Sequence, residues 1–313
     1  MDTTLYNSKT KLNREVWLSE RKAKEAAKSK YKLKLNNRQH LSWIDVGIEA
    51  FGVLLKTLGM YQQGIENAKK VSTKQFSLTF DNLPDSFNDF TVLHLSDLHI
   101  DTIEGFEEVL IEKLNSVDCD ICFWTGDYRK YTSGAYEHVF PALKKIAKSI
   151  NSKHGIYATL GNHDTYAMVP HLQDMGINLL INETIELQNN FGNILITGTD
   201  DPHYYPSEHH EKALQTKKGV FKIALIHSPE MYEEAEKNGY SLYLCGHTHA
   251  GQICLPNGYP PIKNLKKGHQ FSRGLWQHNN MVGYTSPGCG VSGLPVRYNT
   301  QGEITVIHLK KKD

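Results

Sequence analysis

Short apolar runs alternate with polar, helix-like segments over the last three quarters of the chain. Runs rich in β-branched and aromatic residues predict buried strands, whereas segments with apolar positions three and four residues apart predict helices. Alternation of the two kinds predicts a layered α/β core. The clearest predicted strands are 91–95, 121–125, 156–160, 194–197, 223–226, 242–244 and 304–309, and the clearest predicted helices are 106–115, 139–149, 169–175 and 229–238.

Before this core, residues 41–60 carry apolar side chains at the three-four spacing of an amphipathic helix. Asp45, Glu49 and Lys56 interrupt the segment, so it is a poor membrane span. Its apolar face either lies on a bilayer or docks on the core. The turn at 81–84 suggests three parts: a basic N-terminal arm at 1–40, an amphipathic helix and linker at 41–80, and one large domain at 81–313.

Charge is distributed unevenly along the 313 residues, although the net charge is only +1. Residues 1–40 contain eleven Lys or Arg and four Asp or Glu, about +7, which leaves about −6 for the remainder. The basic arm either contacts an anionic surface or is a solvated tail. The negative remainder disfavours nucleic acid, so an anionic membrane surface reached through residues 1–60 is the partner that we expect.

The chain shows no apolar leader in its first 30 residues, and its five cysteines form no even disulfide framework. Both features predict a cytoplasmic protein with reduced thiols. The basic arm adds the option of a peripheral position on the inner face of the membrane.

Polar side chains follow five of the predicted strands at the point where each strand ends. Any one of them could be a helix cap. However, the carboxyl ends of strands meet at one edge of an open α/β sheet, so residues far apart in sequence should converge there. Glycine precedes three of these positions, which permits unusual backbone angles and close approach. The residues are Asp97, His99, Asp127, Asn162, His163, Asp164, His227, His247 and His249.

This mixture of carboxylate, amide and imidazole is what a pair of divalent cations requires for phosphoester hydrolysis. Two cations about 3.5–4 Å apart can clamp phosphate oxygens and activate a bridging water. Neutral ligands keep the cations Lewis-acidic, and nitrogen with oxygen ligands favours Mn, with Fe, Zn, Co, Ni or Mg as alternatives. The pattern therefore predicts a centre with two divalent metal ions.

The five blocks Asp97-x-His99, Gly126-Asp127, Gly161-Asn162-His163-Asp164, His227 and Gly246-His247-Thr248-His249 resemble, in content and order, the calcineurin-like metallophosphoesterase superfamily. The stretches 246–253 and 295–297 are similar to a bacterial branch of phosphodiesterases like UDP-2,3-diacylglucosamine pyrophosphatase. Ala250 departs from that branch, which usually has Gly.

The resemblance implies a four-layer α/β/β/α sandwich, here with an N-terminal helical extension, and it implies a role for each residue of the blocks. Asp97, His99 and His249 would bind one metal, Asn162, His227 and His247 the other, and Asp127 both. His163 would act on the leaving group, and Asp164 would hold its imidazole. Less specific candidates for substrate contact are Arg129, Asp201, His203 and Arg297.

The expected activity is hydrolysis of a phosphodiester or pyrophosphate bond by a metal-bridging hydroxide, in a lipid-linked or nucleotide-sugar substrate. Alternatives within the same fold are a phosphomonoesterase and a nuclease. An alternative from another class is a scaffold protein that keeps the fold without its metals.

Overall fold

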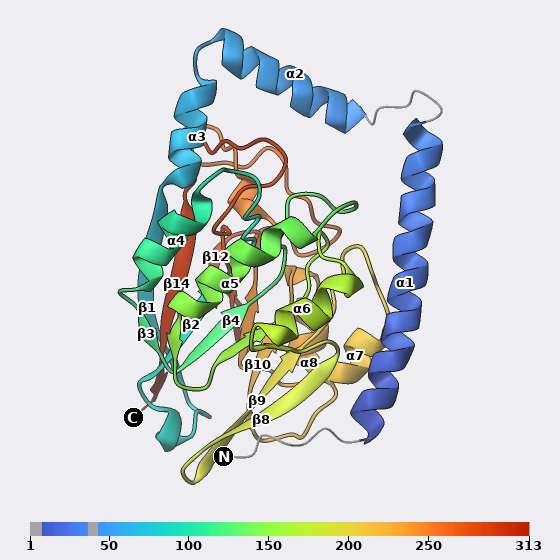
Figure 1. The fold of residues 1–313 in the computed structure, drawn as a ribbon. Coiled ribbons are helices and arrows are strands. Elements are labelled where there is room, and N and C mark those ends of the chain that lie inside the picture. Colours follow the sequence, from blue (N-terminus) through green and yellow to red (C-terminus); the bar gives the residue numbers. More distant parts are fainter. Residues whose placement is uncertain (1–7, 37–42, 313) are drawn as a thin grey trace.

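Two six-stranded mixed sheets face each other in the computed structural model, which describes residues 8–36 and 43–312 (Figure 1). The first sheet has the order β1-β14-β2-β4-β6-β7 and the second β12-β13-β11-β10-β9-β8. The strands of the first sheet are β1 (Val71–Phe80), β2 (Phe90–Leu95), β4 (Ile121–Trp124), β6 (Ile156–Ala158), β7 (Ile177–Leu179) and β14 (Gly302–Lys311). Those of the second are β8 (Glu183–Asn189), β9 (Gly192–Gly198), β10 (Phe221–Leu225), β11 (Leu242–Cys245), β12 (Gly274–His278) and β13 (Met281–Thr285). A small parallel pair, β3 (Asp118–Cys119) and β5 (Asn151–Ser152), stands apart.

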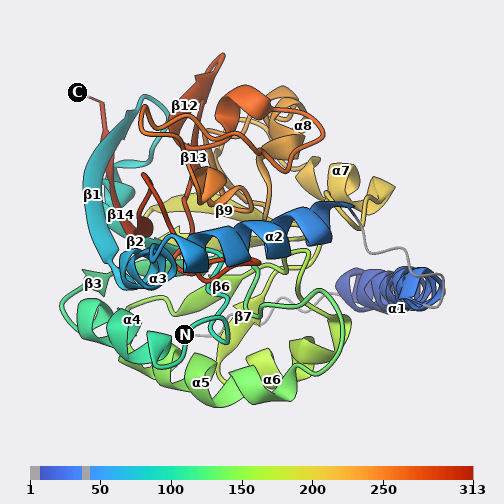
Figure 2. The same cartoon turned by 90° about the horizontal axis from the view of Figure 1, so that it is seen from above.

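Helices cover the outer faces of both sheets, which makes four layers (Figures 1 and 2). On the first sheet lie α4 (Phe106–Leu114), α5 (Phe140–Ser149) and α6 (Val169–Asp174), and on the second α7 (Glu208–Leu214) and α8 (Tyr232–Lys237). The expected α/β/β/α sandwich is confirmed.

The strand sequences produce this layering because side chains of a strand alternate between its two faces. In β2, Leu93 and Leu95 pack in the core beneath α4 and α5, whereas Val92 packs in the core between the sheets. In β10, Ala224 turns to the core under α8, and Ile223 and Leu225 turn to the core between the sheets. Both faces of the central strands are therefore apolar, as for strands covered on both sides.

The strands and helices predicted in the core exist, with boundaries shifted by a few residues. The prediction of a linker up to residue 80 is wrong in its last part, because β1 pairs with β14 from Val71 to Phe80. Because β1 is an edge strand with alternating polar residues, the apolar pattern that predicts a strand is weaker there than in the central strands. The large domain thus begins at or before Val71.

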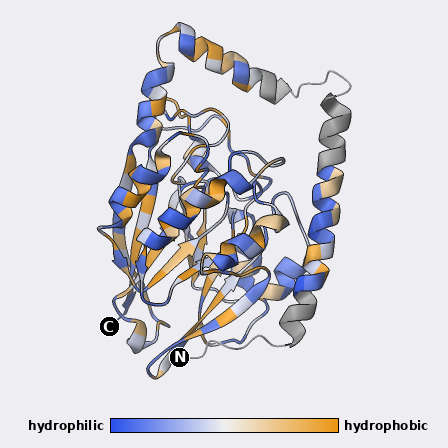
Figure 3. Ribbon diagram, in the orientation of Figure 1, coloured by the Kyte–Doolittle hydropathy of each residue, from blue (hydrophilic) through white to orange (hydrophobic). Residues whose placement is uncertain are grey.

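Two helices replace the single one expected in the amphipathic segment: α2 (Trp43–Thr57) and α3 (Tyr61–Lys69). Gly59, with a φ of 68°, ends the first in the left-handed conformation that commonly terminates helices. Figures 1 and 2 show α2 crossing the end of the molecule, and Figure 3 shows apolar residues along it. Gly52 and Leu55 are buried on its inner side, whereas Val53, Leu54 and Leu58 are exposed.

Among the described helices, none combines the length and apolar character that crossing a membrane requires. The arm at 1–40 contains α1 (Ser8–Asn36), and its residues 1–7 and 37–40 lie outside the described part of the chain.

The middle of α1 is docked on the large domain, so that part of the arm is no solvated tail. Trp17 and Arg21 are buried, and both donate to the carboxylate of Asp200, Trp17 Nε1 at 2.7 Å from Oδ2. Arg14 forms an ion pair with Glu183 at 2.6 Å. Burial disfavours the charge of Arg21, but the attraction of Asp200 raises the pKa of its guanidinium above the ordinary value.

We predict that Arg21→Met lowers the free energy of unfolding by about 3 kcal/mol, because it leaves the Asp200 carboxylate buried without its cation. Chemical denaturation measures the change. Lys22→Met, at the exposed neighbouring position, is the matched control and should change stability by less than about 0.5 kcal/mol. Equal stability of the two variants would contradict the docking described above.

Candidate metal centre

The predicted residues converge where the strands end, at the end of the sandwich that α2 crosses (Figure 1). Asp97 and His99 follow β2, Asp127 follows β4, His227 follows β10, and His247 and His249 follow β11. Asn162, His163 and Asp164 lie in the loop after β6. All except His163 are buried, and the His163 side chain is 15% exposed.

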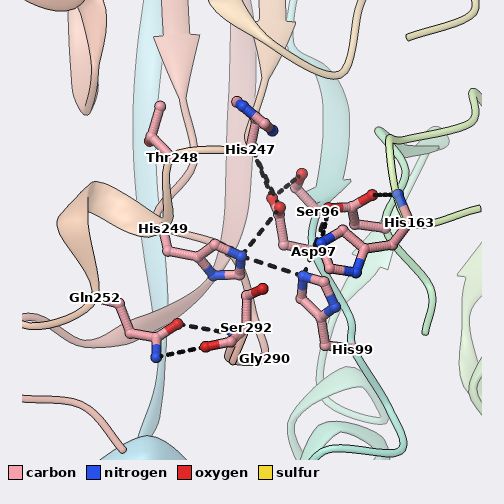
Figure 4. Close-up of polar contacts among 12 residues, drawn as sticks. Ser96, Asp97, His99, His163, His247, Thr248, His249, Gln252, Gly290 and Ser292 are labelled. Carbon is pink, nitrogen blue, oxygen red and sulfur yellow. Dashed lines mark hydrogen bonds and ion pairs between the residues drawn. The ribbon is translucent and has the colours of Figure 1, made fainter. Parts of the chain in front are cut away.

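One group of side chains is formed by Asp97, His99 and His249 (Figure 4). His249 Nε2 lies 3.4 Å from Asp97 Oδ1 and 3.2 Å from His99 Nε2. His99 Nδ1 donates to the carbonyl oxygen of Arg129 at 2.8 Å, which turns its Nε2 toward the group. The three atoms lie close enough to hold one cation.

A second group is formed by Asp127, His227 and His247, with Asn162 beside it. His227 Nδ1 donates to the carbonyl oxygen of Thr125, and His247 Nε2 donates to that of Asn264, both at 2.7 Å. The other nitrogen of each ring is therefore turned into the group, and these two nitrogens face each other at 3.2 Å. A proton or a metal ion between them makes this close approach of two nitrogen atoms favourable.

The Asp127 carboxylate lies between the two groups. Its Oδ2 is 3.6 Å from His99 Nε2 on one side and 3.3 Å from His227 Nε2 on the other. Its Oδ1 accepts from the backbone N–H of His163 at 2.8 Å, which fixes the orientation of the carboxylate. Asp127 is thus placed to serve both groups.

The buried groups of this centre shift one another's pKa values. Burial opposes charge on both groups, but their mutual attraction holds the pKa of His227 well above and that of Asp127 well below the ordinary values. Burial also holds the pKa values of His247 and His249 well below the usual range, which favours neutral rings that could bind a metal ion. A divalent ion held by His227 would have to replace a proton there, so we expect the affinity of the site for the ion to rise with pH. The donor set fits divalent cations.

The backbone at the site is strained where the ligands leave their strands. Positive φ is uncommon for residues other than glycine and concentrates at functional sites. Ala250, where the resembling branch has Gly, shares this conformation with a φ of 51°. The candidate ligands with positive φ are Asp97 (50°), His99 (38°), Asp127 (60°), His247 (71°) and His249 (50°).

Two of the glycines that precede ligands are required by close approach. A Cβ at Gly161 would lie 2.2 Å from Asp127 Oδ1, and one at Gly246 would lie 2.1 Å from Asp97 Oδ2. The carboxylates of Asp127 and Asp97 therefore lie directly against the backbone of neighbouring loops.

Asp164 has a different task from the one expected. Its carboxylate accepts from the backbone N–H groups of Gly161 at 2.7 Å, Asp127 at 2.8 Å and Tyr128 at 2.9 Å, and it does not touch the imidazole of His163. His163 Nδ1 instead donates to the carbonyl oxygen of Lys130 at 2.5 Å. Asp164 therefore joins the loops of Asp127 and Asn162, and a backbone carbonyl orients the histidine.

Three of the four residues predicted to contact substrate are occupied by internal hydrogen bonds. Arg129 donates to the carbonyl oxygens of His163, Gly134 and Ala135. Arg297 donates to those of Pro287, Gly288 and Gly290, and the Asp201 carboxylate accepts from the N–H groups of His203 and Tyr204. All three are buried and position loops around the centre.

His203, the fourth of these residues, reaches the centre itself. Its ring lies 4.4 Å from that of His247, and its Nδ1 pairs with Glu230 at 2.8 Å. Sequence reasoning missed Glu230, as well as Arg21, which donates to the carbonyl oxygen of Asp164 at 2.6 Å. Arg14, Trp17 and Arg21 are spaced three and four residues apart. This spacing was the signal in the sequence that could have predicted which face of α1 docks on the domain.

The family of calcineurin-like phosphoesterases matches residues 90–251, just over half of the chain. An uncharacterized metallophosphoesterase of Bacillus subtilis, YkoQ, is 29% identical over 251 residues, 76% of this chain and 90% of that protein. A second from the same organism, YkuE, is 28% identical over 290 residues, 88% and 98% of the two chains.

A transmembrane protein with a metallophosphoesterase domain from Danio rerio is 28% identical over 282 residues, which cover 83% of this chain and 62% of that protein. A putative 5'-nucleotidase structure from Staphylococcus aureus superimposes with a TM-score of 0.41 at 12% identity, covering 64% and 49% of the two chains.

The matched region contains all seven expected ligands, and the chain belongs to the calcineurin-like phosphoesterase family. It is therefore a metal-dependent enzyme that hydrolyses phosphoesters, which removes the scaffold alternative.

Proposed function

We propose that the enzyme hydrolyses a phosphodiester or pyrophosphate bond with two divalent cations, Mn first among them. The position of the Asp127 carboxylate between two groups of neutral imidazoles carries this proposal. Asp97, His99 and His249 would hold one cation, and Asn162, His227 and His247 the other. The cations would supply Lewis acidity and lower the pKa of a bound water.

His163 would serve the leaving group. Burial lowers the pKa of its ring to about 4 despite the nearby Asp127, and the Lys130 carbonyl fixes its proton on Nδ1. Its Nε2, 3.9 Å from Asp127 Oδ2, is therefore bare before substrate binds. The negative charge of a bound phosphoryl group would raise this pKa, so that Nε2 takes up a proton and delivers it to the departing oxygen.

Two sequence stretches support a substrate like that of the UDP-2,3-diacylglucosamine pyrophosphatase branch, with a lipid part and a nucleotide-linked part. The position of α2 supports it too: this helix, which exposes Val53, Leu54 and Leu58, crosses the end of the molecule where the strands lead into the metal centre (Figure 1). We propose that this end rests on an anionic membrane surface.

Asp127→Asn should lose metal and activity together, because one neutral amide replaces the carboxylate shared by both cations. Protein stripped with a chelator should be inactive towards bis(p-nitrophenyl) phosphate and p-nitrophenyl phosphate, and Mn should restore hydrolysis, with the diester preferred. Elemental analysis measures the metal content, and Asp174→Asn on α6 is the matched control. Full turnover by metal-free protein would refute the two-metal proposal, and a preference for the monoester would favour the phosphomonoesterase alternative.

His163→Ala should retain the metals and lose activity by about 10²–10⁴-fold, as for removal of a general acid. The loss should shrink when the leaving group is a strong acid that needs no proton. A leaving-group series, with metal content measured on the same samples, tests both statements. His171→Ala, at an exposed position of α6, is the control. Loss of metal from His163→Ala would show that His163 is a ligand instead.

Membrane contact should make the full-length protein sediment with anionic vesicles at low salt and release it at high salt, since each basic residue near the surface contributes about 1 kcal/mol. Val53→Glu with Leu54→Glu should abolish sedimentation, because both side chains are exposed on α2. Leu275→Glu, equally exposed on β12, should not. Protein that stays in the supernatant at low salt would rule out the membrane surface as partner.

A further inference from the structure

The segment 264–266, which precedes β12, lies against one of the two groups of candidate ligands. His247 Nε2 donates to the carbonyl oxygen of Asn264 at 2.7 Å, and the Nδ1 of the same ring lies 3.2 Å from His227 Nε2. A partner on one ring nitrogen of a metal-binding histidine sets the direction of the other nitrogen. The orientation of His247 therefore depends on where the chain places the carbonyl group of Asn264.

The carboxylate of Glu230 holds this segment in place. Its Oε1 accepts from the backbone N–H of Lys266 at 2.6 Å and from His203 Nδ1 at 2.8 Å. Lys266 Nζ in turn donates to the carbonyl oxygen of His203, so these three residues form a closed arrangement. The side chains of Glu230 and His203 are buried. Three segments that are far apart along the chain are thereby fixed to one another, two residues from Asn264.

The negative charge of Glu230 strengthens both hydrogen bonds that it accepts. Burial opposes this charge, but the hydrogen bonds from His203 and from the N–H of Lys266 outweigh burial and lower the pKa of Glu230 below its ordinary value. Hydrogen bonds to an ionised acceptor are roughly twice as strong as neutral ones. Without the carboxylate, both donors would lose their acceptor, and the segment 264–266 would be free to shift.

The arrangement serves only one of the two groups of candidate ligands. Glu230 follows His227 by three residues along the chain, and the His203 ring lies 4.4 Å from that of His247. In the part of the chain that the structure describes, the three residues of the arrangement make no hydrogen bond, ion pair or ring contact with the group that contains Asp97. Its contacts therefore lead to the second group alone.

We propose that Glu230 is a positioning residue for the cation of the second group: it fixes the segment 264–266, and the Asn264 carbonyl then aims His247 Nδ1 at the ion. The inference rests on the proposed function, which places one cation in each group, and it assigns the affinity of one site to a residue outside the candidate ligands. An imidazole that is already aimed loses little freedom when the ion binds, so removal of Glu230 should weaken that site.

Glu230→Ala removes the acceptor of both hydrogen bonds and tests the inference. Full-length protein loaded with Mn²⁺ is dialysed against buffers of decreasing free Mn²⁺ concentration, and elemental analysis counts the ions that remain bound. The wild type should hold two ions. Glu230→Ala should bind one of them about 10–100-fold more weakly, as expected when the outer partner of a metal-binding histidine is lost. The other ion should keep its affinity.

Glu230→Gln keeps an oxygen as acceptor and should recover most of the lost affinity, and Glu112→Ala, exposed on α4, is the matched control. Lys266→Met cuts the bond to the His203 carbonyl oxygen and alters no candidate ligand. It should weaken the same site, and it keeps the inference testable if Glu230→Ala does not fold.

A merely structural role of Glu230 would weaken both sites equally or leave both unchanged, and either result would overturn the inference. The proposed function fails in a different way, because a wild type that holds fewer than two ions would refute the two-metal centre itself.

Discussion

The structure around the metal centre depends on a buried carboxylate, Asp127, that must sit between two groups of imidazoles. A carboxylate removed from water is stable only where cations or hydrogen bonds compensate its charge. Here one oxygen accepts a backbone N–H, and the other faces His99 and His227. The loops around Asp127 have conformations that meet this requirement. The glycine before Asn162 lets the backbone contact the carboxylate, and several ligands accept a left-handed backbone to aim at it.

The carboxylate of Asp164 extends the same constraint into the scaffold. By accepting three N–H groups from two loops, it holds the exits of β4 and β6 together, and its own carbonyl is held by Arg21 of α1. Burial, followed by repulsion from Asp127, raises the pKa of Asp164 to about 6. Asp164 lies close behind Asp127, so a change at the helix reaches the centre through one shared loop.

The sequence was sufficient to predict those parts of the structure that follow a regular pattern along the chain. Buried central strands are apolar on both faces, and ligands follow where such strands end, so the core strands and the seven candidate ligands could be placed in advance. The edge strand β1 was not predicted, because the polar residues on its exposed face give the segment the composition of a linker. Arg129 and Arg297 were read as substrate contacts because an arginine that binds backbone carbonyls has no pattern in sequence. The role of Asp164 was predicted wrongly because its partners are backbone N–H groups, and these give no signal in the sequence.

The docking of α1 on the large domain could not be predicted from the sequence either, because polar side chains make its contacts. A helix that packs through apolar residues shows a stripe, whereas α1 packs through Arg14, Trp17, Arg21 and Glu25, and so reads as a solvated basic arm. Its contacts fall on residues 164–166 and 200, immediately beside the loops of His163 and His203. The seven candidate ligands all lie in the loops that follow strands of the two sheets. Because Arg21 of α1 holds the carbonyl oxygen of Asp164, whose carboxylate joins the loops of Asp127 and Asn162, a substitution on this helix can reach the metal centre.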